Sequence, residues 1–413
     1  MTLTFQPSSK LKMMSMAALA VGAVLAGLSF FVNDPTRVWS SFLINNFYFF
    51  GLGIFGAVVI AISYVAHAGW YVVLKRVAEA MSSYIVVGLL GMIVLGLFGK
   101  EYVYEWAIDD IVKHDTILQG KESFLNDTFY FGLIAFALVV WFGGAMVLRK
   151  YSLKEDQEKE GSVKYFWKSY KFSAAFMWLW AFSFCFAIFN WVMSIEPHWY
   201  STIYAVYVFA SILVMGFVFL NVAGIYLKGI NVLPWFNANH QHDTSKFTFG
   251  FSIFWAYIFV SQLLLIWYAN VPEETPYYLL RWGRLEGEAS YKWLWYINLI
   301  INFAAPFLIF MTREAKRKNS IILTLAGIIF VAKWIDFYLL IAPGAFKLSN
   351  HVSHLHIEGM PDHAASPGFG LPEIGFFLFF LGLFLMVVTR SYSKAPVVPK
   401  NHPYLEESLT HHT

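Results

Sequence analysis

Residues 320–342 have the sequence SIILTLAGIIFVAKWIDFYLLIA, an apolar run that contains one lysine and one aspartate. A helix of about 20 apolar residues can cross the hydrocarbon core of a bilayer, so this run predicts a membrane-spanning helix. Lys333 and Asp336 lie inside it, where lipid cannot solvate a charge. The two charges therefore mark this span as a candidate functional element.

The rest of the chain is also strongly apolar. Of its 413 residues, 58% are hydrophobic, 20% are aromatic and 13% are charged, and the mean hydropathy is +0.57. These values are typical of a polytopic membrane protein and not of a soluble globular domain. Lys10 and Lys12 precede an apolar stretch as in a secretory signal, but residues 13–32 are too long for a signal core and predict a retained first helix.

Ten apolar runs are long enough to span a membrane, which predicts an all-α polytopic membrane protein. They lie near residues 12–32, 41–66, 81–98, 127–149, 171–195, 201–227, 247–270, 290–311, 320–342 and 370–390. We interpret the chain as one integral membrane domain, residues 1–413, with these parts: an N-terminal helix at 1–40, a first bundle at 41–195, a second bundle at 196–342, and an outer loop, last helix and tail at 343–413.

The distribution of basic residues predicts the orientation. Of the 29 Lys and Arg residues, 20 lie on the N-terminus, the even-numbered loops and the C-terminal tail, 8 lie on the odd-numbered loops, and one is Lys333. By the positive-inside rule both termini are cytoplasmic. We interpret the charged segments 149–171 and 312–320 as solvated loops, and the long opposite loops 100–127 and 343–367 as docking surfaces.

Several amides share the depth of Asp336 in the predicted helices. At 1.5 Å per residue, Asp336 and Asn190 lie about 9 Å below the outer ends of their spans, and Gln262 and Asn298 about 12 Å below. Asn46 lies at a similar depth, whereas the inner half offers mainly His67, Glu79 and Asn221. Two interpretations stay open: hydrogen bonding between helices, or a polar cavity that opens outward.

Lys333 and Asp336 are three residues apart, so they project from one face of a helix. They are either an ion pair that neutralises itself or a proton relay, in which Asp336 changes its protonation state while Lys333 tunes its acidity.

The sequence predicts no cofactor bound by this chain. One cysteine, Cys185, cannot form a disulfide framework, a cysteine zinc site or a self-contained iron–sulfur cluster. Haem needs paired axial ligands inside helices, but only His67 lies within or at the end of a span. The segment HVSHLHIEGMPDH at 351–363 has several metal-ligand residues, and we interpret it as a partner-contact loop: His351, His354, His356, Glu358, Asp362 and His363.

The turn between the fifth and sixth spans carries two groups that can accept a proton. In NWVMSIEPHWYSTIYAVYVF, residues 190–209, Glu196 and His198 lie at the membrane surface. A quinol headgroup that rises through the bilayer would meet water there, and both side chains could take its protons.

Two stretches resemble a known family. IEPHWYSTIY at 195–204 and GFSIFWAYIFVSQLLLIWYANVPEET at 250–275 resemble the smaller of the two NrfD-like membrane subunits of bacterial alternative complex III, and the resemblance extends over nearly the whole chain. It implies two four-helix bundles, helices 2 to 5 and 6 to 9, with helices 1 and 10 outside.

The resemblance also implies a function and partners. The complex is a quinol:electron-acceptor oxidoreductase of the bacterial inner membrane, and its subunits would be this chain, a larger NrfD-like subunit, an iron–sulfur subunit, and multihaem and monohaem cytochrome c subunits. A terminal oxidase is a further implied partner. Menaquinol is one quinol that the resemblance allows, and the identity of the quinone stays open. Iron–sulfur clusters and c-type haem would sit on the partners, and no nucleic acid is involved. This chain would handle protons or support assembly.

Two alternative functions stay open, a secondary transporter and a purely structural membrane anchor. Transporters often have paired helix breaks near the midplane, and Pro306 is the only proline well inside a predicted span. No loop matches the nucleotide-binding pattern GxxxxGK[ST], so transport driven by nucleotide is not expected.

Overall fold

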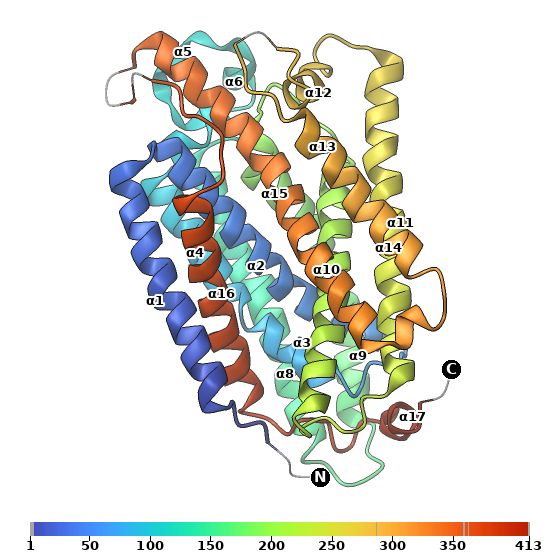
Figure 1. Cartoon of the computed structure of the whole chain (residues 1–413). Coiled ribbons are helices and arrows are strands. Elements are labelled where there is room, and N and C mark those ends of the chain that lie inside the picture. The colour runs from blue at the N-terminus through green and yellow to red at the C-terminus, as the bar shows by residue number, and fades with distance from the viewer. Residues whose placement is uncertain (1–3, 286, 358–359, 362, 412–413) are drawn as a thin grey trace.

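The computed structural model describes residues 4–285, 287–357, 360–361 and 363–411. Over these ranges the chain is helical, and apart from an isolated bridge between Thr4 and Pro396 they contain no β-structure. Ten helices are long and apolar enough to cross a membrane. The prediction of an all-α polytopic membrane protein with ten spans is therefore confirmed (Figure 1).

The spans are longer than their apolar cores. Six spans are single helices: α1 (Ser9–Val32), α2 (Pro35–Val65), α10 (Tyr204–Gly229), α11 (Ala238–Ala269), α15 (Asn319–Leu355) and α16 (Leu371–Tyr392). The third span, Lys75–Phe98, consists of α3 (Lys75–Ser82) and α4 (Ile85–Phe98), and the fifth, Lys164–Ile195, consists of α9 (Lys164–Trp191) and η4 (Met193–Ile195). The fourth, Asp127–Glu155, consists of α7 (Asp127–Ala137), η3 (Leu138–Phe142) and α8 (Gly143–Glu155), and the eighth, Lys292–Ile309, consists of α13 (Lys292–Leu299), η5 (Ile300–Ala304) and α14 (Ala305–Ile309).

Short helices fill the connections. At one end of the bundle lie η1 (Lys100–Tyr102), η2 (Glu105–Ala107), α5 (Asp109–His114), α6 (Thr116–Gly120) and α12 (Pro276–Arg281), and at the other lie η6 (Ala315–Arg317) and α17 (Leu405–Leu409). We name the first the distal end and the second, which holds both termini, the terminal end (Figure 1).

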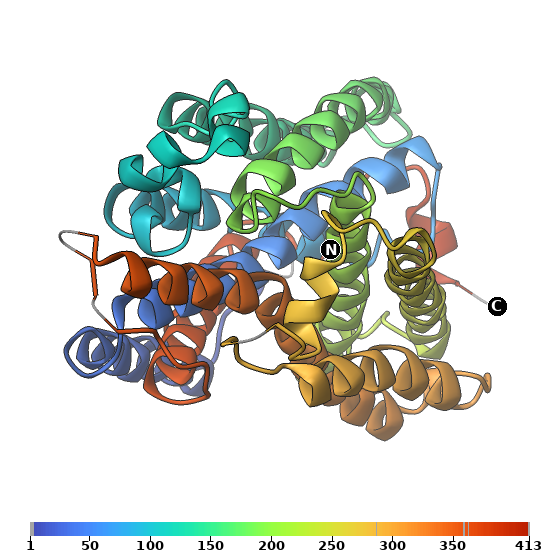
Figure 2. The ribbon, with the colours of Figure 1, turned by 90° about the horizontal axis from the view of Figure 1, so that it is seen from above.

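The spans pack as two groups of four with two helices outside. In the first group α2, α4, α7 with α8, and α9 contact one another, and in the second α10, α11, α13 with α14, and α15 do so. The groups meet where α2 contacts α10 and α15. Seen from above, α1 and α16 lie side by side at the edge (Figure 2).

Glycine allows the closest helix contacts. A Cβ atom at Gly22 of α1 would lie 2.2 Å from the backbone nitrogen of Phe379 in α16, and one at Gly382 would lie 2.5 Å from that of Leu19. Small residues let membrane helices approach in this way. The buried α2 uses the same device, because a Cβ atom at Gly56 would lie 2.5 Å from the Ala78 carbonyl.

Helix α15 differs from its prediction at its distal half. We expected the span to end at residue 342 and a loop to follow, but the helix continues through Pro343 to Leu355. Its 37 residues extend about 55 Å at 1.5 Å each, so it projects well beyond a hydrocarbon core. Pro343 is therefore a second proline inside a span, in addition to Pro306.

The third span of each group contains a π-helical turn. These turns are η3 at Leu138–Phe142 and η5 at Ile300–Ala304. Single π-turns inside α-helices are frequent at functional sites. Only the second group places such a turn beside buried amides, Asn298 and Asn302.

Candidate functional site

The Asp336 carboxylate is the centre of a buried polar site in the second group of spans. It accepts hydrogen bonds from Ser211 (2.6 Å), Trp255 Nε1 (3.0 Å), Asn298 Nδ2 (3.0 Å) and the hydroxyl of Tyr207. The donors come from α10, α11 and α13, whereas Asp336 lies on α15. All four elements of the group therefore converge on one carboxylate.

Lys333 accompanies Asp336 on α15, one turn nearer the terminal end. Its ammonium lies 3.6 Å from Asp336 Oδ2, and both side chains are 0% exposed. The same ammonium lies 4.2 Å from the centre of the Trp255 ring, a cation–π contact. It has no hydrogen-bond acceptor among the described residues.

The two charges are held unequally. Four donors stabilise the ionised carboxylate, because hydrogen bonds to the charged form favour that form. The ammonium has only one ion pair and one ring, and burial disfavours its charge. The surroundings therefore stabilise the charge of Asp336 through more contacts than the charge of Lys333.

Asn302 fixes the orientation of Asn298. Its amide nitrogen donates to Asn298 Oδ1 at 2.6 Å and to the Ala332 carbonyl at 3.2 Å. This leaves the Asn298 amide nitrogen directed at Asp336. The π-turn η5, which contains Asn302, thus belongs to the support of the site.

A cavity of about 20 Å³ adjoins Asp336 on its distal side. That volume holds about one water molecule. Its lining includes Gln262, whose amide nitrogen is buried and has no partner among the described residues. The other lining residues are Tyr207, Phe259, Tyr277, Tyr278, Arg281, Trp295, Asn298, Leu339 and Leu340.

Arg281 lies on α12 at the wall of this cavity and pairs with Glu196, with 2.7 Å between guanidinium and carboxylate. Burial alone would lower the pKa of Arg281, but the Glu196 carboxylate raises it above its ordinary value. The guanidinium also stacks on Tyr277, 3.4 Å from the ring centre. The predicted residue Glu196 is therefore joined to the Asp336 cavity through Arg281.

The helical hydrogen bond that is missing at Pro343 makes room for this pair. Proline has no N–H to donate to the carbonyl four residues earlier, and that carbonyl, Leu339, accepts a hydrogen bond from Arg281 Nε at 3.1 Å. A Cβ atom at the next residue, Gly344, would lie 2.8 Å from Glu196 Cγ. Pro343 and Gly344 thus fit the guanidinium and the carboxylate against α15.

A ladder of hydroxyls leads from the terminal end of α11 toward Lys333. Thr244, Thr248 and Ser252 are buried and spaced four residues apart, and each hydroxyl donates to the carbonyl four residues earlier, beginning at His240. The three hydroxyls cover about 12 Å of helix at 1.5 Å per residue. Its distal end is one turn from Trp255, the ring that contacts Lys333.

His198 is directed away from this site. Its ring nitrogens lie 3.4 Å from Glu105 and 2.5 Å from Asp115, in the loop between the third and fourth spans. The hydrogen bond to Glu105 and the contact with Asp115 raise the pKa of His198 against the effect of burial. His198 therefore attaches a distal loop and does not contact Asp336 or Glu196.

Asn190 and His67 also lie apart from Asp336. The Asn190 amide donates to the Phe124 carbonyl at 3.0 Å in the first group of spans. His67 is exposed at the terminal end, where its ring contacts Phe166 and Tyr170. Of the eight predicted site residues, Lys333, Asp336, Asn298, Gln262 and Glu196 are thus brought together.

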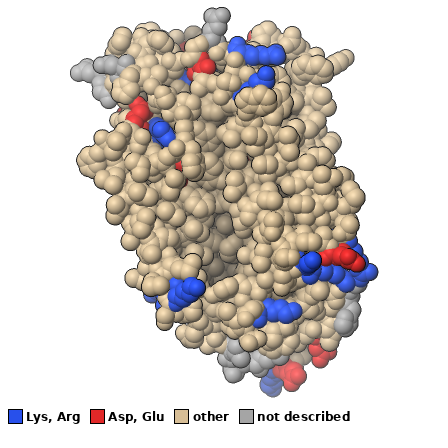
Figure 3. All heavy atoms as spheres, viewed as in Figure 1, with Lys and Arg blue, Asp and Glu red and all other residues tan. Residues whose placement is uncertain are grey.

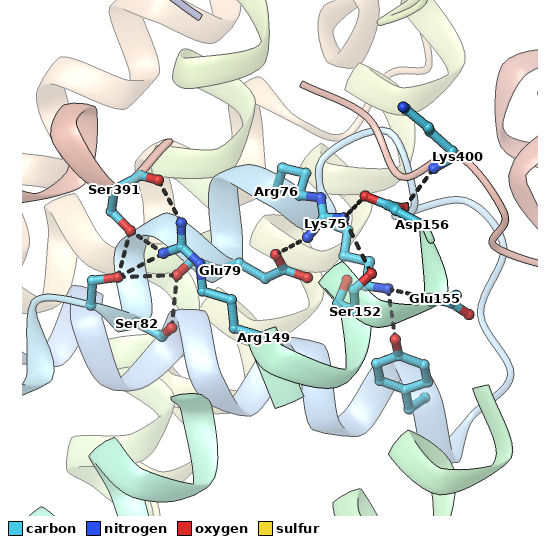
Figure 4. Close-up of polar contacts among 12 residues, drawn as sticks. Lys75, Arg76, Glu79, Ser82, Arg149, Ser152, Glu155, Asp156, Ser391 and Lys400 are labelled. Atoms are coloured by element: carbon cyan, nitrogen blue, oxygen red, sulfur yellow. Dashed lines mark hydrogen bonds and ion pairs between the residues drawn. The ribbon is translucent and has the colours of Figure 1, made fainter. Parts of the chain in front are cut away.

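A second buried charge cluster lies near the terminal end of the first group (Figure 4). Lys75 Nζ lies 3.2 Å from Glu155 and donates to the Tyr64 hydroxyl at 2.6 Å. Arg76 pairs with Glu79 at 2.6 Å and with Asp156. All these charged side chains are almost inaccessible.

The interpretation of residues 149–171 as a solvated run is therefore wrong for its first part. Glu155 and Asp156 pair with α3, and Arg149 donates to Ser83 at 3.0 Å and to Ser391. The cause is a longer span, since α3 begins at Lys75 and not at the predicted residue 81. Buried charges of opposite sign then satisfy one another across helices.

No group of three or more His, Cys, Asp or Glu residues that could hold a metal ion is found in the described part of the chain. Of the histidine-rich segment, Glu358 and Asp362 lie outside the described residues.

No known family model matches the chain, and no similar curated protein is found. The membrane fold is established by the ten apolar helices. The resemblance to NrfD-like subunits stays a prediction from the two sequence stretches.

Proposed function

We propose that this chain is an integral subunit of a respiratory quinol:electron-acceptor oxidoreductase of the bacterial inner membrane, and that it moves protons through the Lys333–Asp336 site. The terminal end would face the cytoplasm and the distal end the periplasm, where the implied iron–sulfur and haem subunits would dock. The buried ion pair at the centre of the second group of spans is the observation that carries this proposal.

Within this site Lys333 would carry the proton and Asp336 would be its counter-ion. In the proton-relay interpretation of the sequence, Asp336 was the group that changes its charge. The four donors around Asp336 support the reverse assignment, because they favour its ionised form. A neutral lysine would leave a stabilised carboxylate, whereas a neutral aspartic acid would leave a buried cation with one aromatic neighbour.

The surroundings of the pair support a route to both ends. Toward the terminal end, the Thr244, Thr248 and Ser252 hydroxyls approach the Trp255 ring. Toward the distal end, the one-water cavity separates Asp336 from Arg281 and Glu196. Hydroxyls and water are groups that can both donate and accept a proton.

The size of the cavity bears on the alternatives. A cavity of about 20 Å³ is too small for a quinol headgroup. Pockets that bind small molecules typically have a volume of several hundred cubic ångströms. Quinol oxidation at this cavity and substrate transport through it are thereby disfavoured. Quinol would react on the larger paralogous subunit, and this chain would handle protons.

Purification tests the proposal at its broadest level. The full chain carries an affinity tag and is isolated in mild detergent, and its partners are identified by subunit mass and by the absorption spectrum. Co-purifying haem-bearing partners with quinol oxidase or quinol:acceptor activity support the proposal. A colourless homo-oligomer contradicts it.

A further inference from the structure

An apolar groove of about 220 Å³ lies on the outer face of the bundle near the terminal end. Its walls come from α3, α10 and α16, and its lining includes Val77, Ala80, Phe219, Ala223, Leu385 and Val388. Figure 3 shows the face hollowed in this region, with Lys and Arg side chains on both sides of the lower part.

Basic residues surround the terminal end of this groove. Lys12, Lys228 and Arg390 each directly follow a lining residue, namely Leu11, Leu227 and Thr389. Lys10 and Lys394 lie within two residues of the lining, and all five basic side chains belong to exposed residues. We name these five residues the basic rim.

The basic rim has no acidic partner among the residues that the structure describes. The segments that carry it, residues 1–33, 219–230 and 385–400, contain no Asp or Glu. None of its five residues forms an ion pair with another described residue. The other cluster at this end is different, since Lys75 and Arg76 are paired with carboxylates.

We propose that the groove binds one anionic phospholipid of the leaflet at the terminal end, with an acyl chain along α10 and α16 and the phosphate at the basic rim. From Phe219 to Leu227 the lining extends about 12 Å at 1.5 Å per residue, along the direction of a lipid chain. Basic pockets between membrane helices are typical binding sites for anionic headgroups.

The dimensions favour a lipid chain over a helix of a partner protein. A helix with its side chains is about 10–12 Å wide, so 12 Å of its length would fill about 1,000 Å³. The groove offers about 220 Å³. A single flexible hydrocarbon chain fits this space, and its burial is favourable because the lining is apolar.

Lipid retention tests this proposal without any measurement of turnover, so its outcome is independent of the proposed function. The purified full chain is delipidated in detergent, mixed with phosphatidylglycerol or phosphatidylcholine of the same acyl chains, and analysed by native mass spectrometry. We expect one phosphatidylglycerol to be retained at detergent concentrations that remove phosphatidylcholine.

Two variants, each with a matched control, test the rim and the groove separately. Lys228→Gln with Arg390→Gln lowers phosphatidylglycerol retention by about thirtyfold, since each basic residue near an anionic surface contributes about fivefold. Lys168→Gln with Lys171→Gln, which also removes two exposed charges, leaves retention unchanged. Ala223→Trp fills the groove and abolishes retention, whereas Ala175→Trp on the exposed face of α9 does not.

Three outcomes overturn the proposal. They are equal retention of the two lipids by the wild-type chain, equal loss in the rim and control charge variants, and crosslinking of a partner helix into the groove in the assembled complex. The rim variants change only exposed side chains, so they test the site even where Ala223→Trp does not fold.

Discussion

Arg281 donates a hydrogen bond to the backbone carbonyl of Leu339, 3.1 Å away, at the point where α15 would otherwise satisfy that carbonyl itself. Pro343 removes the helical donor, and the guanidinium replaces it. The same guanidinium holds Glu196. The hydrogen bond that α15 lacks at Pro343 thus fixes the position of Arg281, which closes the distal side of the Asp336 cavity.

Arg281 and Pro343 should therefore be energetically coupled. Arg281→Met leaves Glu196 unpaired and the Leu339 carbonyl without a partner, and we expect it to cost about 3–5 kcal/mol. Pro343→Ala restores a helical donor to that carbonyl and should recover about 1 kcal/mol in the Arg281→Met background. Thermal unfolding of the four proteins in detergent measures the cycle. Pro306→Ala serves as the control, and equal rescue by it would contradict the coupling.

His198 should make the distal loop sensitive to pH. The raised pKa of His198 means that the folded state binds the proton more tightly than the unfolded state. The stabilisation is then fully present below about pH 6.5, the ordinary histidine value, and is lost as the pH rises through the raised value. Hydrogen exchange of residues 105–120 should accelerate over that rise.

A histidine control separates this effect from general base-catalysed exchange. His198→Asn should remove the extra pH dependence, whereas His114→Gln should keep it, because His114 bonds only to the backbone of its own helix among the described contacts. The two variants behaving alike would exclude His198 as the cause.

The buried cluster of the first group should respond strongly to single substitutions. Glu155→Ala leaves the Lys75 ammonium buried without its carboxylate, and we expect a loss of about 3–5 kcal/mol. The double variant Lys75→Met, Glu155→Leu should lose much less than the sum of the two single losses. Thermal unfolding provides the comparison, with Lys113→Met at an exposed ion pair as a neutral control. Simple additivity would mean that the pair is not coupled.

The α11 ladder should matter for proton delivery and little for folding. Thr248→Val keeps the shape of the side chain and removes the hydroxyl, and we expect proton translocation in proteoliposomes to fall severalfold while the free energy of unfolding falls by about 1 kcal/mol. Thr244→Ser keeps a hydroxyl and should retain most activity. Unchanged translocation in Thr248→Val would remove the ladder from the route.

The fold could be predicted from the sequence, because each membrane-spanning helix needs an apolar run of about 20 residues. The Lys333–Asp336 pair and the depth of Asn298 and Gln262 were also predictable, since polar side chains stand out in such runs. Tyr207 and Trp255 were not, because an aromatic side chain in an apolar helix usually indicates packing or an interface position.

Other buried polar residues could not be predicted from the sequence, or were not, for different reasons. Arg281 lies on a six-residue helix between two spans, where hydropathy shows only a loop. The predicted spans ended short of Lys75 and Glu155, because each span was predicted from its own hydropathy. That the two charges neutralise each other across helices cannot be read from one span alone. The spacing of Thr244, Thr248 and Ser252 was a visible signal that was overlooked.

The most direct test of the central claim is quinol-driven proton translocation by the purified complex with Lys333→Arg in proteoliposomes. Arginine keeps a positive charge opposite Asp336 but does not release its proton in proteins. With assembly and haem content confirmed as unchanged, we predict that proton translocation falls at least tenfold, and that Lys333→Met has the same effect. Full translocation by Lys333→Arg would contradict the account and leave Lys333 as the permanent counter-ion of Asp336.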